Sequence, residues 1–396
     1  MDSTRKNVFL LACCQALLLT NNVTLIAMNG LAGYMLATDK MLATLPATFY
    51  IIGAAASTIP SSLLMKRIGR RRGFLAGCVF GIVGAAIATF GIYTSSFWTL
   101  CAGTMVLGTY NAFGQYYRFA AADAAQPDFK AKAISYVLAG GLVGGIVGPE
   151  LSKYTRDASQ PPFLLSYASL MVFCLVAMAI LARLQIPEPK QAESMEPPRP
   201  MAEIMAQPVF FVAVIGAALG YGAMNLLMTA TPLAMGFCGH PYSAAASVIS
   251  AHVIAMFGPS FFTGSLIKRF GVLPVMFTGA LLMVACVVIG LSGQLVSHFM
   301  AALVLLGAGW NFLYVGGTTL MTEAYRPNER AKTQGMNEIL IFTVTATSSF
   351  ASGVLVNAKG WNTLNWVALP MLAAIVIALA WLAMRRRATR AIEAPT

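Results

Sequence analysis

Charge is the scarcest property of this chain. Charged residues make up 10% of its 396 residues, whereas a soluble domain usually carries about 25%. Hydrophobic residues make up 58% of the sequence, which is more apolar surface than one water-facing globule can hide. The solvent of the chain must therefore be lipid. This excludes a soluble enzyme, a nucleic-acid-binding protein and a protein with a single membrane anchor.

Several chemical motifs are missing as well. The seven cysteines show no CxxC spacing, so a disulfide framework is not indicated. The sequence has no Walker A pattern, so ATP is not the evident energy source. Neither HExxH nor a GxSxG elbow occurs, and we therefore do not expect an enzyme. No tightly bound cofactor is expected either.

Long apolar runs fill most of the sequence instead. A helix needs about 20 apolar residues to cross the hydrocarbon core. Continuous runs exclude a β-barrel, whose strands alternate apolar and polar residues over about ten positions. The expected fold class is all-α and integral to the membrane, with spans at 8–34, 43–65, 74–94, 97–121, 133–151, 163–184, 208–234, 244–267, 273–292, 297–321, 334–356 and 363–384.

The basic residues predict the topology. If both termini are cytoplasmic, the 26 Lys and Arg all lie on inner segments except Lys40, Lys153, Arg156 and Lys359. An excess of basic residues on the inner side is the usual determinant of orientation. The net charge of +12 is therefore attributed to topology and not to nucleic acid. We expect a multi-pass protein of the bacterial inner membrane, most simply a monomer, with both termini in the cytoplasm.

The chain also contains an internal repeat. Residues 62–69 match residues 264–271, and Asp123 recurs as Glu323. A proline-rich segment with a linker composition separates the two copies. The expected domains are an N-terminal six-helix bundle (1–184), a cytoplasmic linker (185–207) and a C-terminal six-helix bundle with a short cytoplasmic tail (208–396).

The loop between the second and third expected spans carries a motif. It approximates G-x-x-x-D-R-x-G-R-R through Arg67, Gly69, Arg70 and Arg71, and its repeat contains Lys268, Arg269 and Gly271. With these residues and its two halves, the chain resembles the major facilitator superfamily over nearly its full length. The resemblance implies a conformational switch at these loops and a site between the halves that opens alternately to each side. Lys66 replaces the acid of the motif, so the interdomain charge cluster of that family is not carried over.

A strip of methionine and histidine is predicted on the seventh and eighth spans. Met224 and Met228 are spaced i, i+4 in one span, and His252 and Met256 have the same spacing in the next. Thioethers and a neutral imidazole are ligands that suit Cu(I). The alternative that these residues only pack in the core stays open. With 22 methionines about one MxxxM pair is expected by chance, and Met often fills core gaps.

The same two motifs resemble those of CcoA-like copper importers, which are bacterial major facilitator proteins. The resemblance implies that copper binds at Met224, Met228, His252 and Met256, and that Cys238 is an accessory thiol. Copper would then be the transported substrate, and a cytoplasmic copper chaperone for cytochrome oxidase assembly would be a partner. Related transporters of this branch carry riboflavin, so the branch alone does not fix the substrate.

Polar residues within the spans are further candidates, because they are costly in lipid unless they serve a function. Those expected to line the cavity or to couple transport are Asn22, Tyr110, Gln115, Tyr117 and Arg118. Arg118 could instead pair with Asp123. Glu338 could carry a proton, although an interfacial salt bridge is the simpler interpretation. The leading hypothesis is a copper importer, and the alternative is a transporter of an organic solute, by riboflavin-like vitamin uptake or proton-coupled export.

Overall fold

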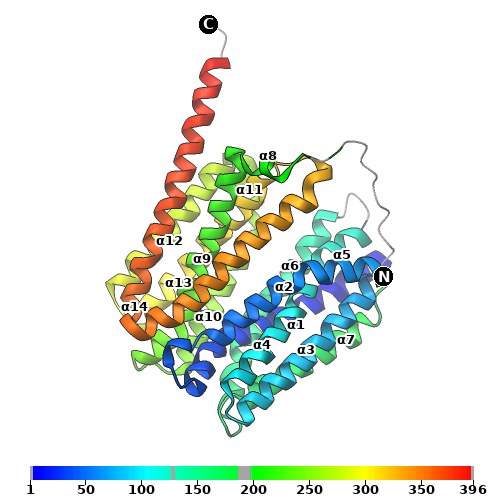
Figure 1. Cartoon of the computed structure of the whole chain (residues 1–396), viewed down its shortest axis with the longest axis vertical. Coiled ribbons are helices and arrows are strands. Elements are labelled where there is room, and N and C mark those ends of the chain that lie inside the picture. The colour runs from blue at the N-terminus through cyan, green and yellow to red at the C-terminus, as the bar shows by residue number, and fades with distance from the viewer. Residues whose placement is uncertain (1–2, 126–129, 186–196, 198, 394–396) are drawn as a thin grey trace.

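The computed structural model describes residues 3–125, 130–185, 197 and 199–393, and these residues form helices and connecting segments without any strand. Two bundles lie side by side (Figure 1). The first contains α1 (Ser3–Leu36), η1 (Lys40–Leu42), α2 (Leu45–Ile68), α3 (Arg70–Tyr93), α4 (Phe97–Gly114), α5 (Tyr117–Ala124), α6 (Lys130–Thr155) and α7 (Leu164–Leu181). The second contains α8 (Met201–Met205), α9 (Pro208–Phe237), α10 (Tyr242–Phe257), α11 (Ser260–Phe270), α12 (Val272–Ser292), α13 (Val296–Met321), η2 (Pro327–Glu329) and α14 (Arg330–Glu393).

Four of the predicted spans do not form separate, unbroken helices. The fourth divides into α4 and α5, and the eighth into α10 and α11, which meet at an angle of 41°. The last two predicted spans form the two arms of α14, which are separated at Gly360, where φ is +75°. Of the helices in the described part of the chain, eight are long and apolar enough to cross a membrane by themselves, or nine if α10 and α11 form one span. The architecture agrees with the expected all-α membrane fold.

Each bundle has its own packing. In the first, α1 packs against α6 and α7, and α4 packs against α2 and α3. In the second, α9 packs against α13 and α14, and α13 also contacts α10 and α12. Small residues permit these approaches: a Cβ at Gly140 of α6 would come within 2.2 Å of the carbonyl oxygen of Ala12 in α1.

The two bundles meet where α2 and η1 pack against α14, where α6 packs against α10, and where α1 packs against α9 and α10. In Figure 1 the bundles converge at the end where η1 lies and separate toward the end that carries α5, α8 and α11. The expected linker, 185–207, lies mostly outside the described residues. Its last part, from Arg199 onward, packs against the second bundle.

Candidate functional site

The first bundle presents a chain of polar side chains at its contact with the second. Asn22 of α1 accepts a hydrogen bond from the Tyr50 hydroxyl of α2 and donates one from Nδ2 to Oδ1 of Asn111, at 2.9 Å. Gln115, which caps α4, donates from Nε2 to the same Asn111 oxygen at 3.2 Å. Three helices are thus joined by amides and one phenol. Such a network offers both donors and acceptors to a ligand.

The second bundle contains a cluster of aromatic rings on α9, α10 and α13. Trp310 and Tyr314, one turn apart on α13, stack with their ring centroids 4.9 Å apart and their planes 10° from parallel. Tyr221 of α9 meets Trp310 edge to face at 5.3 Å, and Phe257 of α10 does so at 6.3 Å. Trp310 is 5% exposed, and its indole Nε1 has no hydrogen-bond partner among the described residues. A buried indole N–H normally has a partner, so this donor is available to a ligand.

The two sets of side chains lie opposite each other. Tyr50 of the first bundle lies within electrostatic range of Tyr221 of the second. Through Tyr50 and Tyr221 the amides of the first bundle therefore approach the rings of the second, which we call the aromatic wall: Tyr221, Phe257, Trp310 and Tyr314. That combination suits a flat, uncharged molecule with polar edges, because rings stack on rings and amides bind the edges.

A charged pair lies beside the aromatic wall. Arg118 of α5 lies within electrostatic range of Tyr314 of α13 and of Glu338 of α14. Its guanidinium also lies 4.9 Å from the ring of Phe119. Asp123, the alternative partner of Arg118 in the sequence, pairs instead with Arg70. Arg118 therefore links the two bundles, and that alternative pairing is wrong.

Hydrogen bonds join the two bundles on the predicted outer side. The Tyr242 hydroxyl of α10 donates to Ser152 Oγ of α6 at 2.7 Å, and Lys153 Nζ lies 2.9 Å from Ser247 Oγ. Ser349 of α14 accepts from Thr44 Oγ1 through its backbone oxygen at 2.8 Å. These contacts, which we call the outer seal, hold the outer ends of the bundles together.

The predicted copper ligands lie in the core of the second bundle. Met224, Met228, His252 and Met256 are all at most 7% exposed. His252 donates from Nδ1 to the Leu303 carbonyl of α13 at 2.7 Å, while its Nε2 has no partner among the described residues. In that part of the chain no three His, Cys, Asp or Glu side chains come close enough to hold a metal ion. A copper site would therefore depend on the thioethers, and the four-residue ligand set stays a prediction.

The predicted accessory thiol belongs to an outer loop. Cys238 caps α9, and its Sγ donates to Gln294 Oε1 at 3.3 Å, while His240 Nε2 donates to the Gln294 carbonyl at 2.7 Å. Burial raises the pKa of the Cys238 thiol, which keeps it protonated. The described contacts of Cys238 fix a turn, and its role as a copper thiol stays a prediction.

The two predicted switch loops have the same backbone form. Gly69 and Gly271 have φ values of +83° and +90° between α2 and α3 and between α11 and α12. Only glycine adopts this conformation easily, so the internal repeat preserves a tight turn. Arg71 donates to the Ala182 carbonyl, and the guanidinium of Arg269 lies 5.2 Å from the ring of Phe270. Their part in switching stays a prediction, as does that of Arg67 and Lys268.

The structure divides the predicted cavity residues into two groups. Asn22, Gln115 and Arg118 belong to the polar chain or to the charged pair between the bundles. Tyr110 and Tyr117 are at most 1% exposed and pack in the core of the first bundle, where Tyr117 meets Phe74 edge to face at 4.9 Å. Trp310 and Tyr314 of the aromatic wall were not identified as site residues in the sequence analysis. Its only signal was the i, i+4 spacing of Trp310 and Tyr314, which is no different from that of lipid-facing rings.

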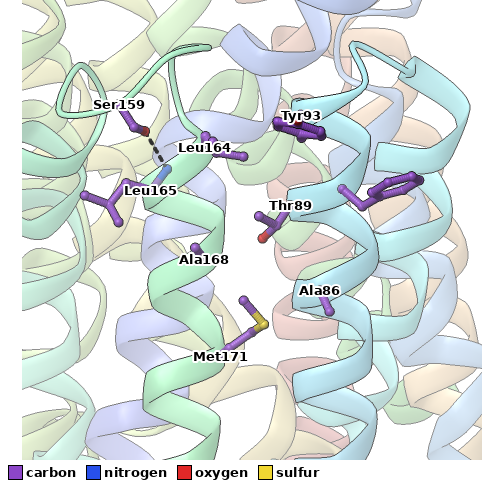
Figure 2. A pocket seen from close by; sticks show the side chains of 9 residues that line it. Ala86, Thr89, Tyr93, Ser159, Leu164, Leu165, Ala168 and Met171 are labelled. Carbon is purple, nitrogen blue, oxygen red and sulfur yellow. Dashed lines mark hydrogen bonds between the residues drawn. The ribbon is translucent and has the colours of Figure 1, made fainter.

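A separate groove lies on the flank of the first bundle. It runs between α3 and α7, has a volume of about 440 Å³ and is lined by Thr89, Tyr93 and Met171, among others (Figure 2). Its walls are almost wholly apolar, and the hydrogen bond from the Leu165 N–H to Ser159 Oγ closes its edge. A groove of this kind on a spanning surface suits lipid chains, and it is distinct from the site between the bundles.

The family of the chain follows from its sequence as well as from its fold. The profile of the Major Facilitator Superfamily matches residues 8–260 and 239–396. The chain belongs to the major facilitator superfamily. Like other proteins of that family it is a multi-pass membrane transporter, and the family supports the expectation that it is not an enzyme.

Two sequence relatives and two solved structures show which transporters the chain is similar to. The riboflavin transporter RfnT of Brucella anthropi is 40% identical over 380 residues, which cover 95% of this chain and 96% of that protein. An uncharacterized transporter of Bacillus subtilis, YddS, is 28% identical and covers 84% of the chain. Among solved structures, the xylose transporter XylE of E. coli matches with a TM-score of 0.73 at 11% identity, covering 97% of this chain and 98% of its own. The nucleoside transporter NupG matches with a TM-score of 0.69 at 16% identity, over 95% and 99% of the two chains. These two structures support the fold, whereas RfnT supports the organic-solute alternative better than copper.

Proposed function

We propose that this transporter takes up riboflavin, or a closely similar flat heteroaromatic vitamin, across the membrane by alternating access. The observation that carries the proposal is 40% identity with a named riboflavin transporter along 95% of the chain. Copper import, the leading hypothesis from the sequence, becomes the second candidate.

The chemistry of the site between the bundles supports this substrate. Riboflavin has a planar three-ring system whose pyrimidine edge carries one N–H donor and two carbonyl acceptors. The stacked rings of Trp310 and Tyr314 offer a surface for the ring system. The amides of Asn22, Asn111 and Gln115 offer donors and acceptors for its edge. The hydroxylated side chain of the vitamin is polar and uncharged, so no excess of charge is needed to hold it.

The orientation and location are part of the same proposal. With both termini in the cytoplasm of a bacterial cell, the outer seal faces the periplasm and the aromatic wall lies within the inner membrane. The substrate would then enter when the outer seal opens and leave toward the cytoplasm when it closes. A monomer suffices for this mechanism, because both walls of the site come from one chain.

One observation keeps copper as the second candidate. The buried Nε2 of His252 has no hydrogen-bond partner in the part of the chain that the structure describes, and the bond from Nδ1 to Leu303 fixes the tautomer that leaves a lone pair on Nε2. A soft ion between that nitrogen and the sulfur of Met256 would use it. Under this alternative Cu(I) is the substrate, and a cytoplasmic chaperone would receive it.

Uptake of both substrates by one set of cells tests the proposal. Bacteria that cannot make riboflavin would carry the wild type, Trp310→Ala or an empty vector, and would receive radiolabelled riboflavin or radioactive copper. We expect growth on low riboflavin and labelled uptake with the wild type, and a strong loss with Trp310→Ala. Wild-type riboflavin uptake no greater than that of the empty vector, with copper uptake above it, would replace riboflavin by copper as the substrate.

A further inference from the structure

The eighth predicted span is broken where α10 and α11 meet at an angle of 41°. Pro259 lies at the break and has no backbone N–H, so the Ala255 carbonyl one turn earlier receives no helical hydrogen bond from it. Beyond the break, the Phe261 N–H reaches back only three residues, to the Gly258 carbonyl at 3.4 Å. Helices bend where their hydrogen-bond ladder is interrupted in this way. This span is therefore bent most easily at Pro259.

One buried amide bridges the two sides of the break. Asn311 of α13 is 1% exposed and donates from Nδ2 to the Met256 carbonyl at 2.7 Å, on the α10 side. It also donates to Ser260 Oγ at 2.6 Å and accepts from Thr263 Oγ1 at 2.7 Å, both on the α11 side. The nitrogen and the oxygen of the amide are thus both used at the break. Asn311 therefore fixes the angle between α10 and α11.

Helix α10 is held firmly against α13. A Cβ at Gly307 of α13 would come within 2.5 Å of the His252 carbonyl, so the two helix backbones are in close contact. His252 also donates from Nδ1 to the Leu303 carbonyl of α13 at 2.7 Å. Helix α10 therefore moves with α13 as one body.

Helix α11 is held much more weakly. All of its residues are described, and Thr263 alone among them is buried. Phe261 and Phe270 are 62% and 56% exposed, and a Cβ at Gly264 would meet no atom within 4 Å. A segment with few buried contacts separates easily from the rest of a structure. Because Thr263 is bonded to Asn311, this bond is the main buried attachment of α11.

The break lies between the aromatic wall and one end of the molecule. Phe257, the last residue of α10, belongs to the aromatic wall, and Trp310 of the same wall directly precedes Asn311. Helix α11 continues from there to the end at which the bundles separate, which the basic residues predict to be the inner end (Figure 1). A change of angle at Pro259 would therefore move α11 at this opening and leave the aromatic wall in place.

The first half of the chain is built differently at the matching position. Asn111 is the counterpart of Asn311 in the internal repeat, 200 residues earlier, and it belongs to the polar chain between the bundles. The helix that corresponds to α10 and α11 is α2, which runs from Leu45 to Ile68 without a break although it contains Pro60. The break and the amide that bridges it thus occur together, in the second half. This is expected if the amide serves the break.

We propose that α11 is an inner gate that pivots at Pro259, and that Asn311 is the latch that holds the gate in its present position. When the halves rock toward the outward-facing state, the inner ends of the two bundles approach each other. The bonds from Asn311 to Ser260 and Thr263 then break, and α11 turns toward the first bundle while α10 stays on α13. The movement of the gate does not depend on the substrate, and only its effect on release of the vitamin rests on the proposed function.

The distance between α11 and the rest of its own bundle tests the gate without a substrate, and rocking of the halves does not change it. Nitroxide labels at Lys268→Cys on α11 and Met384→Cys on α14 report this distance by pulsed electron resonance. The two native thiols that are not buried, Cys13 and Cys238, are first replaced by serine. The protein with the native amide should show one main distance. Asn311→Leu removes the amide at similar volume and should raise the population of a second distance by about fivefold.

Other variants control for damage to the fold. Asn365→Leu is the matched control, because Asn365 is as deeply buried and donates to the Trp361 carbonyl at 3.0 Å within α14. It should leave the distance unchanged. Ser260→Ala and Thr263→Val each remove one bond to Asn311 and should give smaller shifts, so they decide the question if Asn311→Leu does not fold. An unchanged distance in all the latch variants that fold would overturn the inference.

Riboflavin transport connects the gate with the proposed function. Asn311→Leu should lower the turnover rate by about fivefold, because an unlatched α11 obstructs release at the inner end. The affinity of the purified variant for riboflavin should stay within about twofold of the wild type, since the aromatic wall is unchanged. An equal loss of affinity and turnover would show a damaged wall and contradict the gate. Absence of riboflavin transport by the wild type would refute the proposed function alone, and the distance measurement would still decide on the gate.

Discussion

Arg199 and Glu329 form a bidentate ion pair that anchors the end of the linker to the second bundle. Arg199 donates from Nη2 to Glu329 Oε2 at 2.7 Å and from Nε to Oε1 at 2.8 Å, and its backbone N–H also donates to Oε1 at 2.9 Å. The Glu329 side chain is fully buried. Paired hydrogen bonds in this geometry are both strong and specific. The end of the linker is therefore fixed to the second bundle just before α8.

Loss of this pair should destabilise the protein. Arg199→Ala would leave the buried Glu329 carboxylate without its partner, and we expect the unfolding temperature in detergent to fall by about 5 °C. Arg386→Ala is the matched control, because it removes a more exposed ion pair with Glu323. This variant should lower the unfolding temperature much less. An equal fall in both variants would contradict the special role of the linker anchor.

The same pair predicts a dependence of stability on pH. The hydrogen bonds from Arg199 hold the pKa of Glu329 well below its ordinary value, so the folded state favours the carboxylate. The resulting stability is complete above the ordinary carboxyl pKa of about 4.3 and is lost as the pH falls further toward the lowered folded-state value. Thermal unfolding between pH 3 and pH 7 should therefore show a smaller loss at low pH for Glu329→Gln than for the wild type. Parallel curves for the two proteins would refute this.

Stacking on the aromatic wall predicts a graded effect on uptake. Trp310→Ala removes the ring that stacks on Tyr314, and the KM for riboflavin should rise about tenfold, which corresponds to ~1.4 kcal/mol. Trp310→Phe keeps a ring, so its KM should lie between the values for the wild type and for Trp310→Ala. Trp366→Ala is the control, because this indole is 61% exposed on a membrane-facing surface of α14. Radiolabelled uptake over a range of concentrations gives all four values, and an equal loss in Trp366→Ala would point to misfolding.

The sequence predicts those features of the fold and the site that depend on one helix or loop alone. It does not predict those that depend on how distant helices pack together. Hydropathy and the repeat predicted the spans, the two halves and the two loops that carry the repeated motif, because these features are local. The positive φ of Gly69 and Gly271 in those loops was found only in the structure. The pairing of Arg118 with the second bundle was not predictable, since it depends on how helices far apart in sequence rotate and meet. Tyr110 and Tyr117 show the same limit: hydropathy does not say which face of a span meets the core and which meets a cavity.

The hydrogen bonds of the outer seal should favour the state in which the outer ends of the two bundles are held together. Tyr242→Phe removes the hydrogen bond to Ser152 that joins α10 to α6 at 2.7 Å. One hydrogen bond contributes about 1 kcal/mol, so the outward-facing population should rise about fivefold. Labels at Thr94→Cys and Leu295→Cys on the outer loops would report the change as a longer distance. Ser96→Ala is the control, because its bond to Thr99 at 2.8 Å lies within one bundle. An unchanged distance distribution in Tyr242→Phe would show that this bond does not hold the seal.

The two candidate substrates predict opposite results for the methionines. Met224→Leu and Met256→Leu conserve volume in the core of the second bundle, where both residues are at most 7% exposed. If riboflavin is the substrate, its uptake should stay within about twofold of the wild type in both variants, because no thioether is needed. If copper is the substrate, loss of one soft ligand should lower copper uptake at least tenfold. Uptake of both labelled substrates by the same cells therefore decides between them, and protein levels in the membrane exclude misfolding as the cause.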